Sequence, residues 1–559
     1  MSAAARDSYT PQGRDELVFL PLGGTGEIGM NLNLYGHDGK WLMIDCGVTF
    51  ADDATPGVDV IMPDPAFIAE RRRDIAGLVL THGHEDHIGA VPYLWPQLRC
   101  PVYATPFTAA LVRRKLAEAG IEDDVSLTEV PMSGRFTVGP FELELITLTH
   151  SIPEPNAVVI RTAAGTVLHT GDWKLDPNPL IGDTADEAAL RRLGGEGVLA
   201  MICDSTNALV EGESGSEEAV RASLRELVGR YEHRVAVACF ASNVVRVRTI
   251  AEIAAHHGRH PALVGRSLGR IVEAARECGI HLPEFMGEQE AATLPRDRVL
   301  LICTGSQGEP RAALARIARD DHPNITLDGG DAVIFSSRII PGNERSIGRL
   351  QNMLALRGIV VVTERDHFVH VSGHPARDEL IRMYQWVRPT IAVPTHGEAR
   401  HMIGHAELAR ACQVPQTVVI ANGDLLRLSG RHAEVVGQVH HGRLAVDGTR
   451  LVTLDGETMR RRQRMLWNGS ALLTLVMDED GRLVADPQLS APGLIEDAAA
   501  DGEVLEDIVD AVIDAVESLP RSLRRDDEEV REAARRAVRR GFRARWGKRP
   551  PTDVHLVRL

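Results

Sequence analysis

The segment THGHEDHIGA, residues 81–90, indicates which kind of site and fold this chain builds. It places His82, His84, Asp86 and His87 within six consecutive positions. His82 and His84 are two positions apart, so both side chains point to the same side of an extended segment. Imidazole and carboxylate groups are the ligands that zinc takes in compact sites. A solvated, histidine-rich loop is the alternative, but four ligand-type residues so close together favour a metal site.

Further ligands are expected where predicted strands end, because strand ends gather polar side chains at one edge of a sheet. His150 directly follows the alternating segment 141–149, and His396 ends the apolar run that begins at residue 390. Asp172 follows a predicted hairpin that turns at residues 164–165. Each of these residues alone could be an ordinary turn residue. Together with the first motif they predict two metal ions about 3.5–4 Å apart that share one carboxylate. The predicted ligands are His82, His84 and His150 for one metal, Asp86, His87 and His396 for the other, and Asp172 as the bridge.

The spacing of the apolar runs predicts an inserted domain. Up to about residue 210, short apolar runs bounded by Gly and Pro indicate sheets in a sandwich with helices outside. Regular strand–helix alternation then predicts a parallel-sheet α/β block. Strand patterns return at 390–396 and 417–423, which is why the block looks inserted. The predicted domains are 17–210 and 366–446 for the divided first domain, 211–365 for the insertion, 447–467 for a linker and 468–559 for a small α+β C-terminal domain.

Composition narrows the class of protein. The chain has 559 residues, 44% of them hydrophobic and 25% charged, which is typical of a globular protein. No run of about 18 apolar residues predicts a membrane span, and the first residues do not resemble a secretory signal. Seven cysteines without a CxxC pair favour a reducing cytoplasm. With a net charge of −16, any nucleic-acid site must be a local basic channel.

A glycine pattern near the start could be mistaken for a dinucleotide-binding motif. Gly24, Gly26 and Gly29 satisfy GxGxxG after a predicted strand at 17–22. A dinucleotide site needs a helix next, so that the pyrophosphate lies at the helix N-terminus. The following residues, NLNLYG at 31–36, alternate between polar and apolar and predict a strand instead. We therefore expect a glycine turn between two strands.

The ligand pattern resembles the metallo-β-lactamase superfamily. In that resemblance Asp45, at the end of its predicted strand, is the carboxylate that orients the histidine loop. Small hydrolases of the superfamily place the last histidine soon after the bridging aspartate, whereas 224 positions separate Asp172 from His396 here. An insertion at this point is similar to the β-CASP branch, whose members are nucleases. The resemblance implies an α/β fold: an αββα sandwich, an inserted α/β β-CASP domain and a small C-terminal domain.

Several motifs further resemble the bacterial ribonuclease J family over residues 17–445. They are GGTGEIG (23–29), DSTNA (204–208), FASN (240–243), TGSQGEP (304–310), IPGNE, HVSGHP (370–375) and PTHGEARH (394–401). Met30 departs from the Lys expected after GEIG, and Pro375-Ala376 departs from the small residues usual after HVSGH. Neither departure involves a predicted ligand.

The resemblance implies a mechanism and its residues. Two Zn²⁺ ions per subunit, with Mn²⁺ or Mg²⁺ as stimulating ions, would activate a water that attacks an RNA phosphodiester. His374 matches the family's general acid, Asp204 orients it or a metal ligand, and Asp172 serves catalysis as the bridge. The products would carry a 5′-phosphate and a 3′-hydroxyl. The implied activity is a 5′-to-3′ exonuclease acting in mRNA decay and rRNA or other RNA maturation, and its balance with endonuclease cleavage is left open.

The resemblance also implies a pocket for the 5′-terminal phosphate of single-stranded RNA, one that prefers a monophosphate. Short hydroxyls and backbone N–H groups suit such a pocket. The residues that match the family's motifs are Ser242, Asn243, His370, Ser372, Gly373 and His374. The implied assembly is a homodimer, or a tetramer, through the C-terminal domain, and the implied location is the cytoplasm without membrane association. Partners for RNA degradation are left unidentified.

Other interpretations stay open from the residues alone. A β-CASP DNA nuclease would differ in contacts to the ribose 2′-hydroxyl, which no motif reports. A small-substrate hydrolase, such as a thioesterase or lactonase, is disfavoured by the long insertion. A non-catalytic scaffold is disfavoured because all seven ligands are present. The loops TGSQGEP and IPGNE could bind phosphate or simply turn the chain, and Arg246 is expected on a helix facing the cleft or solvent.

Overall fold

In the computed structural model, residues 13–52, 54–430, 432–496 and 501–559 are described. The chain forms two compact units. The first contains the described residues up to 49 and residues 62–442, and the second contains residues 50–61 and 443–559. Among the described residues, no helix is long and apolar enough to cross a membrane.

Two sheets form the centre of the first unit. One has eight strands in the order β22-β21-β1-β2-β3-β6-β7-β8, and the other has seven in the order β20-β19-β13-β12-β11-β10-β9. The strands of the first sheet are Leu17–Gly23 (β1), Leu32–His37 (β2), Lys40–Ile44 (β3), Ile75–Val79 (β6), Val102–Ala104 (β7), Leu127–Glu129 (β8), Asp424–Arg427 (β21) and Glu434–Gln438 (β22). Those of the second are Arg135–Val138 (β9), Phe141–Thr147 (β10), Asn156–Thr162 (β11), Gly165–His169 (β12), Ala200–Asp204 (β13), Ile391–Thr395 (β19) and Gln416–Thr417 (β20).

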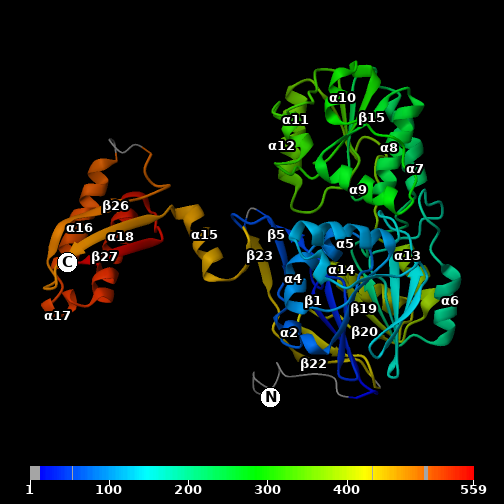
Figure 1. The fold of residues 1–559 in the computed structure, drawn as a ribbon, viewed down its shortest axis with the longest axis horizontal. Helices are drawn as coiled ribbons and strands as arrows, with labels where there is room; N and C mark the ends of the chain where they lie inside the picture. Colours follow the sequence, from blue (N-terminus) through cyan, green and yellow to red (C-terminus); the bar gives the residue numbers. More distant parts are fainter. Residues whose placement is uncertain (1–12, 53, 431, 497–500) are drawn as a thin grey trace. The chain divides into compact units, whose positions relative to one another are not determined.

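A hydrophobic core fills the space between these two sheets. Phe19 and Ile44 of the first sheet share it with Leu145 and Val158 of the second. Helices α6 (Glu187–Glu196), α13 (Arg377–Val387) and α14 (Ala399–Ala411) contribute to a second core on the other face of the second sheet. Helices α4 (Val91–Leu98) and α5 (Pro106–Ala119) pack together, and α5 contacts strands β7 and β8 of the first sheet (Figure 1). The predicted αββα sandwich is confirmed.

The inserted block contains its own parallel sheet, in the order β15-β16-β14-β17-β18. The strands are Val235–Ala238 (β14), His260–Val264 (β15), Val299–Cys303 (β16), Ala332–Phe335 (β17) and Val360–Val362 (β18). Helices α11 (Ala313–Ala318) and α12 (Glu344–Leu356) lie on one side, and α8 (Val244–His256) lies on the other (Figure 1). Helix α9 (Arg266–Glu277) contacts α5 of the sandwich. The predicted strand–helix alternation is confirmed.

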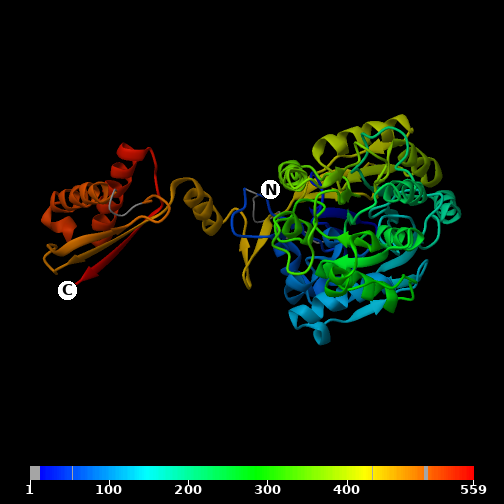
Figure 2. The ribbon, with the colours of Figure 1, turned by 90° about the horizontal axis from the view of Figure 1, so that it is seen from above.

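The second unit contains a three-stranded sheet in the order β26-β25-β27. Its strands are Ala471–Met477 (β25), Leu483–Ser490 (β26) and Thr552–Arg558 (β27). Helices α16 (Gly502–Glu517) and α18 (Asp527–Trp546) pack on one face of this sheet (Figure 2). The segments SALLTLVMD (470–478) and EDIVDAVIDAVESL (506–519) predict β25 and α16 from the sequence, whereas no such segment predicts β26 or β27.

Residues 443–468 of the second unit form strands and a helix. The sheet β24-β23-β5-β4 contains Thr49–Phe50 (β4), Val60–Pro63 (β5), Arg443–Asp447 (β23) and Arg450–Thr453 (β24). The segment 447–467, predicted to be a linker, thus contains β24 and most of helix α15 (Glu457–Asn468).

Two turns decide local details of the sandwich. Gly24, Gly26 and Gly29 lie between β1 and β2 with φ values of 86°, 82° and 99°, a region that glycine adopts without steric cost. A strand follows these glycines, so the prediction of a turn rather than a dinucleotide site is confirmed. The β11–β12 hairpin turns at residues 163–164, one position earlier than predicted, because Gly165 already pairs with Thr162.

Candidate metal centre

The histidine-rich motif lies where strand β6 ends and the short helix α3 (Glu85–Ile88) begins. His84 is the residue before the helix, so Asp86 and His87 belong to its single turn. Successive residues of a helix are rotated by about 100°, which points Asp86 and His87 in different directions from the two preceding histidines. The helical turn therefore divides the motif between two clusters.

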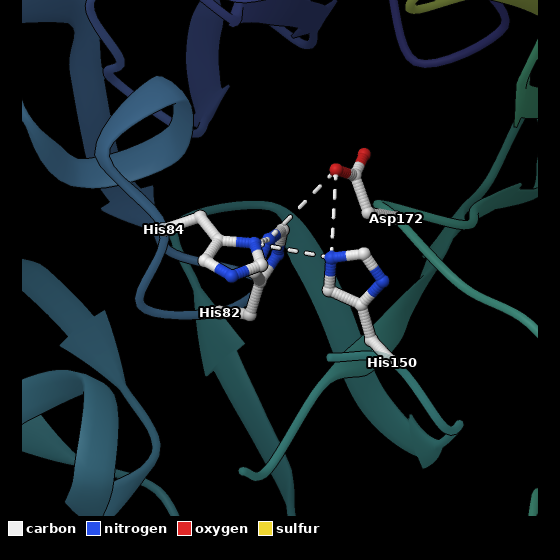
Figure 3. A group of neighbouring side chains, drawn as sticks. All are labelled: His82, His84, His150 and Asp172. Atoms are coloured by element: carbon white, nitrogen blue, oxygen red, sulfur yellow. Dashed lines mark hydrogen bonds and ion pairs between the residues drawn. The ribbon is translucent and has the colours of Figure 1, made fainter. Parts of the chain in front are cut away.

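The first cluster contains three histidines and one aspartate (Figure 3). His84 Nδ1 lies 3.1 Å from His82 Nε2 and 3.0 Å from His150 Nε2. The ligand-type atoms of these three histidines and Asp172 all lie within 4.8 Å of one another. The structure thus brings together the three histidines predicted to bind one metal, with Asp172 beside them.

The second cluster contains Asp86, His87 and His396, and it shares Asp172 with the first. Asp172 Oδ2 lies 3.2 Å from His87 Nε2 and 3.4 Å from His396 Nε2. The same oxygen lies 3.9 Å from Nε2 of His82 and 3.9 Å from Nε2 of His150. One carboxylate oxygen therefore lies between the two groups, as expected of a bridging ligand.

Asp45 fixes the orientation of the histidine loop from behind. His87 Nδ1 donates to Asp45 Oδ2 over 2.7 Å, and Thr81 donates to the same carboxylate through its backbone N and its Oγ1. Because the Thr81 hydroxyl proton points to Asp45, Thr81 Oγ1 accepts from His82 Nδ1 at 3.0 Å. Asp45 contacts the loop as the resemblance implied. These bonds leave the Nε2 atoms of His82 and His87 facing Asp172.

Two further contacts orient the remaining histidines. His396 Nδ1 donates to Asn31 Oδ1 over 3.1 Å, and His150 Nδ1 donates to the Gly373 carbonyl over 2.5 Å. Asn31, two residues after Gly29, was not predicted as a site residue. Its only signal would have been a polar residue at the start of a strand that is buried throughout.

The cluster is buried but incompletely satisfied. Asp172 Oδ1 and His396 Nε2 are buried without a hydrogen-bond partner in the described part of the chain. Burial lowers the pKa of His82 and His150 well below the usual value, and it lowers the pKa of His84 to about 4. Neutral imidazoles present lone pairs, so the donor atoms fit divalent cations of the kind that nitrogen and oxygen ligands bind.

His374 and Asp204 form a dyad at the edge of the second cluster. His374 Nδ1 donates to Asp204 Oδ2 over 2.8 Å, and its ring stacks on that of His396 with centroids 5.6 Å apart. Burial opposes the charged form of His374, but Asp204 and Asp172 outweigh it and raise its pKa to about 9. Because Nδ1 is held by Asp204, Nε2 is the ring nitrogen left for proton transfer.

The residues implied for a phosphate pocket lie in two groups. Ser372 and Gly373 lie beside the dyad: Ser372 Oγ accepts from His374 N over 3.2 Å, and a Cβ on Gly373 would lie 2.6 Å from the His150 ring. Asn243 instead caps helix α8, where its side-chain oxygen accepts from Arg246 N. The hydrogen bonds among the described residues link neither Ser242 nor Asn243 to the dyad. The Nδ1 atom of His370 is buried without a partner among them.

Arg246 was expected to face a cleft or solvent, but it does neither. Its side chain is fully buried. Its Nε and Nη2 donate to the Glu217 carboxylate over 3.0 Å and 2.8 Å, which compensates the buried charge. Its Nη1 donates to Ser336 O and to Val369 O, each over 3.0 Å. This guanidinium therefore joins helices α7 (Glu217–Val228) and α8 to the segment that leads into His370.

Fold and site together define a metallo-hydrolase of the metallo-β-lactamase superfamily. The family model described as "Metallo-beta-lactamase superfamily" matches residues 29–228, and "Zn-dependent metallo-hydrolase RNA specificity domain" matches residues 358–417. "Ribonuclease J, beta-CASP domain" matches residues 232–354, and "Ribonuclease J C-terminal domain" matches residues 457–559. The chain belongs to the ribonuclease J family.

Similar curated proteins agree with the family models. A ribonuclease J of Sinorhizobium meliloti is 47% identical over 499 residues, which cover 88% of each chain. One of Mycolicibacterium smegmatis is 43% identical over 488 residues, covering 86% of this chain and 87% of the relative. A crystal structure of a protein of unknown function from Enterococcus faecalis is 16% identical with a TM-score of 0.52, covers 74% of this chain and all of its own, and shows a shared fold. Family membership supports a ribonuclease activity and the use of divalent metal.

Proposed function

We propose that this protein is a two-metal ribonuclease that degrades single-stranded RNA from its 5′ end. The observation that carries the proposal is the pair of clusters around Asp172 Oδ2, with two buried ligand-type atoms that have no partner among the described residues. His82, His84 and His150 would hold one divalent cation, and Asp86, His87 and His396 the other, with Asp172 between them. The imidazole-rich set favours Zn²⁺, with Mn²⁺ or Mg²⁺ as additional activators.

Divalent cations held by these residues would supply activation of a water and neutralisation of charge on the phosphate. The protein supplies the remaining functions. Asp45 and Asn31 hold the histidine rings in the orientation that the site needs. His374 donates a proton from Nε2 to the leaving 3′-oxygen, while Asp204 fixes its tautomer through Nδ1. The products would be nucleotides with a 5′-phosphate and RNA with a new 5′-end.

A pocket for the 5′-terminal phosphate gives the direction of degradation. Ser372 and Gly373 lie directly beside the general acid, where a hydroxyl and backbone N–H groups suit a phosphate. The missing Cβ of Gly373 leaves room for the His150 ring. His370, Ser242 and Asn243 complete the pocket in this proposal. Preference for a monophosphate follows from its size. Cleavage inside a chain would be a secondary activity, and mRNA decay and rRNA maturation would be the cellular uses.

The proposal extends to the state of the protein in the cell. We place it in the cytoplasm, as a homodimer or tetramer formed through residues 468–559, with access to partners of RNA degradation. The domain boundaries proposed from the sequence, including the insertion at 211–365, provide the units for testing these assignments.

The experiment follows 5′-labelled, 5′-monophosphorylated single-stranded RNA with the purified protein, Zn²⁺ and Mn²⁺. Release of labelled mononucleotide, absent in Asp86→Ala, supports the exonuclease with its terminal pocket. Labelled fragments of intermediate length would show internal cutting and weaken the pocket. No RNA cleavage with metals bound, or equal cleavage of a DNA of the same sequence, would contradict the ribonuclease assignment. His374→Ala, which removes the proposed general acid, should also lose cleavage. Its matched control is His256→Ala, which removes an exposed imidazole of helix α8 and should retain cleavage.

A further inference from the structure

Two loops of the inserted domain are joined by one buried side chain. Gln307, in the loop after β16, is 5% exposed. Its Nε2 donates to Arg338 O over 2.8 Å, and its Oε1 accepts from Ile340 N over 3.0 Å. Two backbone groups on either side of residue 339 are therefore fixed by the same amide. The loop after β17 has a defined conformation, and the position of Arg338 follows from it.

From this loop, the Arg338 side chain contacts the segment that follows strand β13 of the sandwich. Its Nη1 donates to Asn207 Oδ1 over 2.9 Å. Asn207 is buried, and its Nδ2 donates to Ser372 Oγ over 2.7 Å and to His374 O over 3.1 Å. One asparagine thus connects the Arg338 guanidinium to the hydroxyl and the backbone of the segment that carries the general acid.

The charge of Arg338 is not neutralised by a neighbouring carboxylate. Its side chain is exposed, and no ion pair joins it to an acidic residue in the described ranges of the chain. Arg246, in contrast, is enclosed by Glu217. A guanidinium has five N–H donors, and the bond to Asn207 uses one of them. The remaining donors are free to form the paired bonds with which arginine recognises phosphate.

We propose that Arg338 binds a phosphate of the RNA substrate beside Ser372 and thereby determines which RNA ends the enzyme accepts. The proposal rests on the ribonuclease function proposed above. It assigns a cation to a pocket whose other proposed groups are hydroxyls, amides and histidines. Burial, followed by Arg246, Lys174 and Arg338, lowers the pKa of His370 well below its usual value, so His370 contributes no charge of its own.

The test compares three full-length variants. Arg338→Gln keeps a donor for Asn207 but removes the charge, and Arg338→Lys keeps the charge. Arg349→Gln, which removes another exposed arginine of the inserted domain, is the matched control. Each is assayed on RNAs of one sequence with a 5′-monophosphate or a 5′-hydroxyl. Each change is also combined with Asp86→Ala, so that RNA binding is measured by fluorescence anisotropy without turnover.

Arg338→Gln should raise KM for the monophosphorylated RNA about tenfold, because a charge-assisted bond is lost, with kcat changed less. The slope of log affinity against log salt should become shallower by about 0.7. Arg338→Lys should recover part of both effects, and Arg349→Gln should show neither. A loss confined to monophosphorylated RNA identifies the terminal phosphate as the ligand and supports the role in selecting RNA ends. An equal loss on both RNAs identifies an internal phosphate and overturns that role.

The proposal is overturned if Arg338→Gln leaves affinity and salt slope unchanged. It is also overturned if Gln and Lys weaken binding equally without a change in slope, because Arg338 would then only hold Asn207 in place. Failure of the proposed function gives a different result: the wild-type protein would not cleave RNA, while the binding measurements on Asp86→Ala would still report on Arg338.

Discussion

Two buried polar groups in the first unit differ in how completely their hydrogen-bonding capacity is used. In one, the Arg246 guanidinium and the Glu217 carboxylate satisfy each other, and Ser336 and Val369 accept the remaining donors. In the other, Asp172 Oδ1 and His396 Nε2 are buried without partners among the described residues. Burying an unpaired polar atom costs about 1–3 kcal/mol. The first arrangement needs no ligand to satisfy its polar atoms, whereas the second is complete only with a ligand.

The largest expected effect comes from removing the shared carboxylate. Asp172→Asn should lower the rate of RNA cleavage about 10⁴-fold or more, because the side chain shared by both clusters loses its charge. Metal content, measured on the purified variant, should fall as well. The fold should survive, because an amide fills the same space. A variant that keeps both metals and wild-type cleavage would remove the basis for a shared ligand.

The Arg246–Glu217 pair should affect stability instead of metal binding. Arg246→Met leaves a buried carboxylate without its partner and should lower the free energy of unfolding by about 3–5 kcal/mol, measured in urea. The double variant Arg246→Met, Glu217→Leu should recover most of that loss, because no buried charge is left unpaired. Normal stability of the single variant would contradict the distinction drawn between the two groups.

These two groups were not equally predictable. The grouping of the seven predicted ligands was predictable, because four of them lie within six positions and the other three lie within three residues of the ends of strands β10, β12 and β19. Arg246 was not, since its burial depends on Glu217, Ser336 and Val369, which lie 29, 90 and 123 positions away. The same holds for Asn31 and Asn207, whose amides act through contacts 365 and 165 positions away.

The fold shows the same division. The parallel sheet of the inserted domain was predicted, because β14, β16 and β17 are buried, continuous apolar runs that are each followed by a helix. Strands β26 and β27 were missed because most of their side chains are partly or fully exposed, so the apolar signal is weak. Helix α15, most of which lies in the segment predicted as a linker, was not predicted for a related reason: Met459 is its one buried residue in the described structure.

A third buried group lies behind Asp204 and extends the comparison to pH. His405 Nδ1 lies 2.9 Å from Ser205 Oγ and Nε2 lies 2.8 Å from the Tyr384 hydroxyl, so both ring nitrogens have partners. Burial lowers the pKa of His405 to about 4. At a pH below about 6.5, the usual pKa of histidine, His405 binds a proton in the unfolded chain but stays neutral in the folded chain. Stability from this group is therefore present above pH 6.5 and is lost as pH falls towards 4, by about 3 kcal/mol in total.

His405→Gln should remove that dependence while keeping polar atoms in the site. Urea unfolding of the chelator-treated protein at several values between pH 7 and 4 should show a smaller loss of stability for the variant than for the wild type. His256→Ala, at an exposed position, should retain the wild-type dependence. Parallel curves for the wild type and His405→Gln would mean that His405 is protonated in the folded state.

The smallest effect is expected from Asp45, whose carboxylate contacts the side chains of Thr81 and His87. Asp45→Asn weakens the orientation of both side chains without removing a ligand. Metal affinity should fall about 10–100-fold, in line with other residues that hold a ligand in position. Cleavage should recover at high Zn²⁺, whereas cleavage by Asp172→Asn should not. If added metal restores cleavage in neither variant, or in both equally, the experiment does not distinguish Asp45 as a positioning residue from Asp172 as a ligand. The contrast between satisfied and unsatisfied buried groups then loses its support at the metal centre.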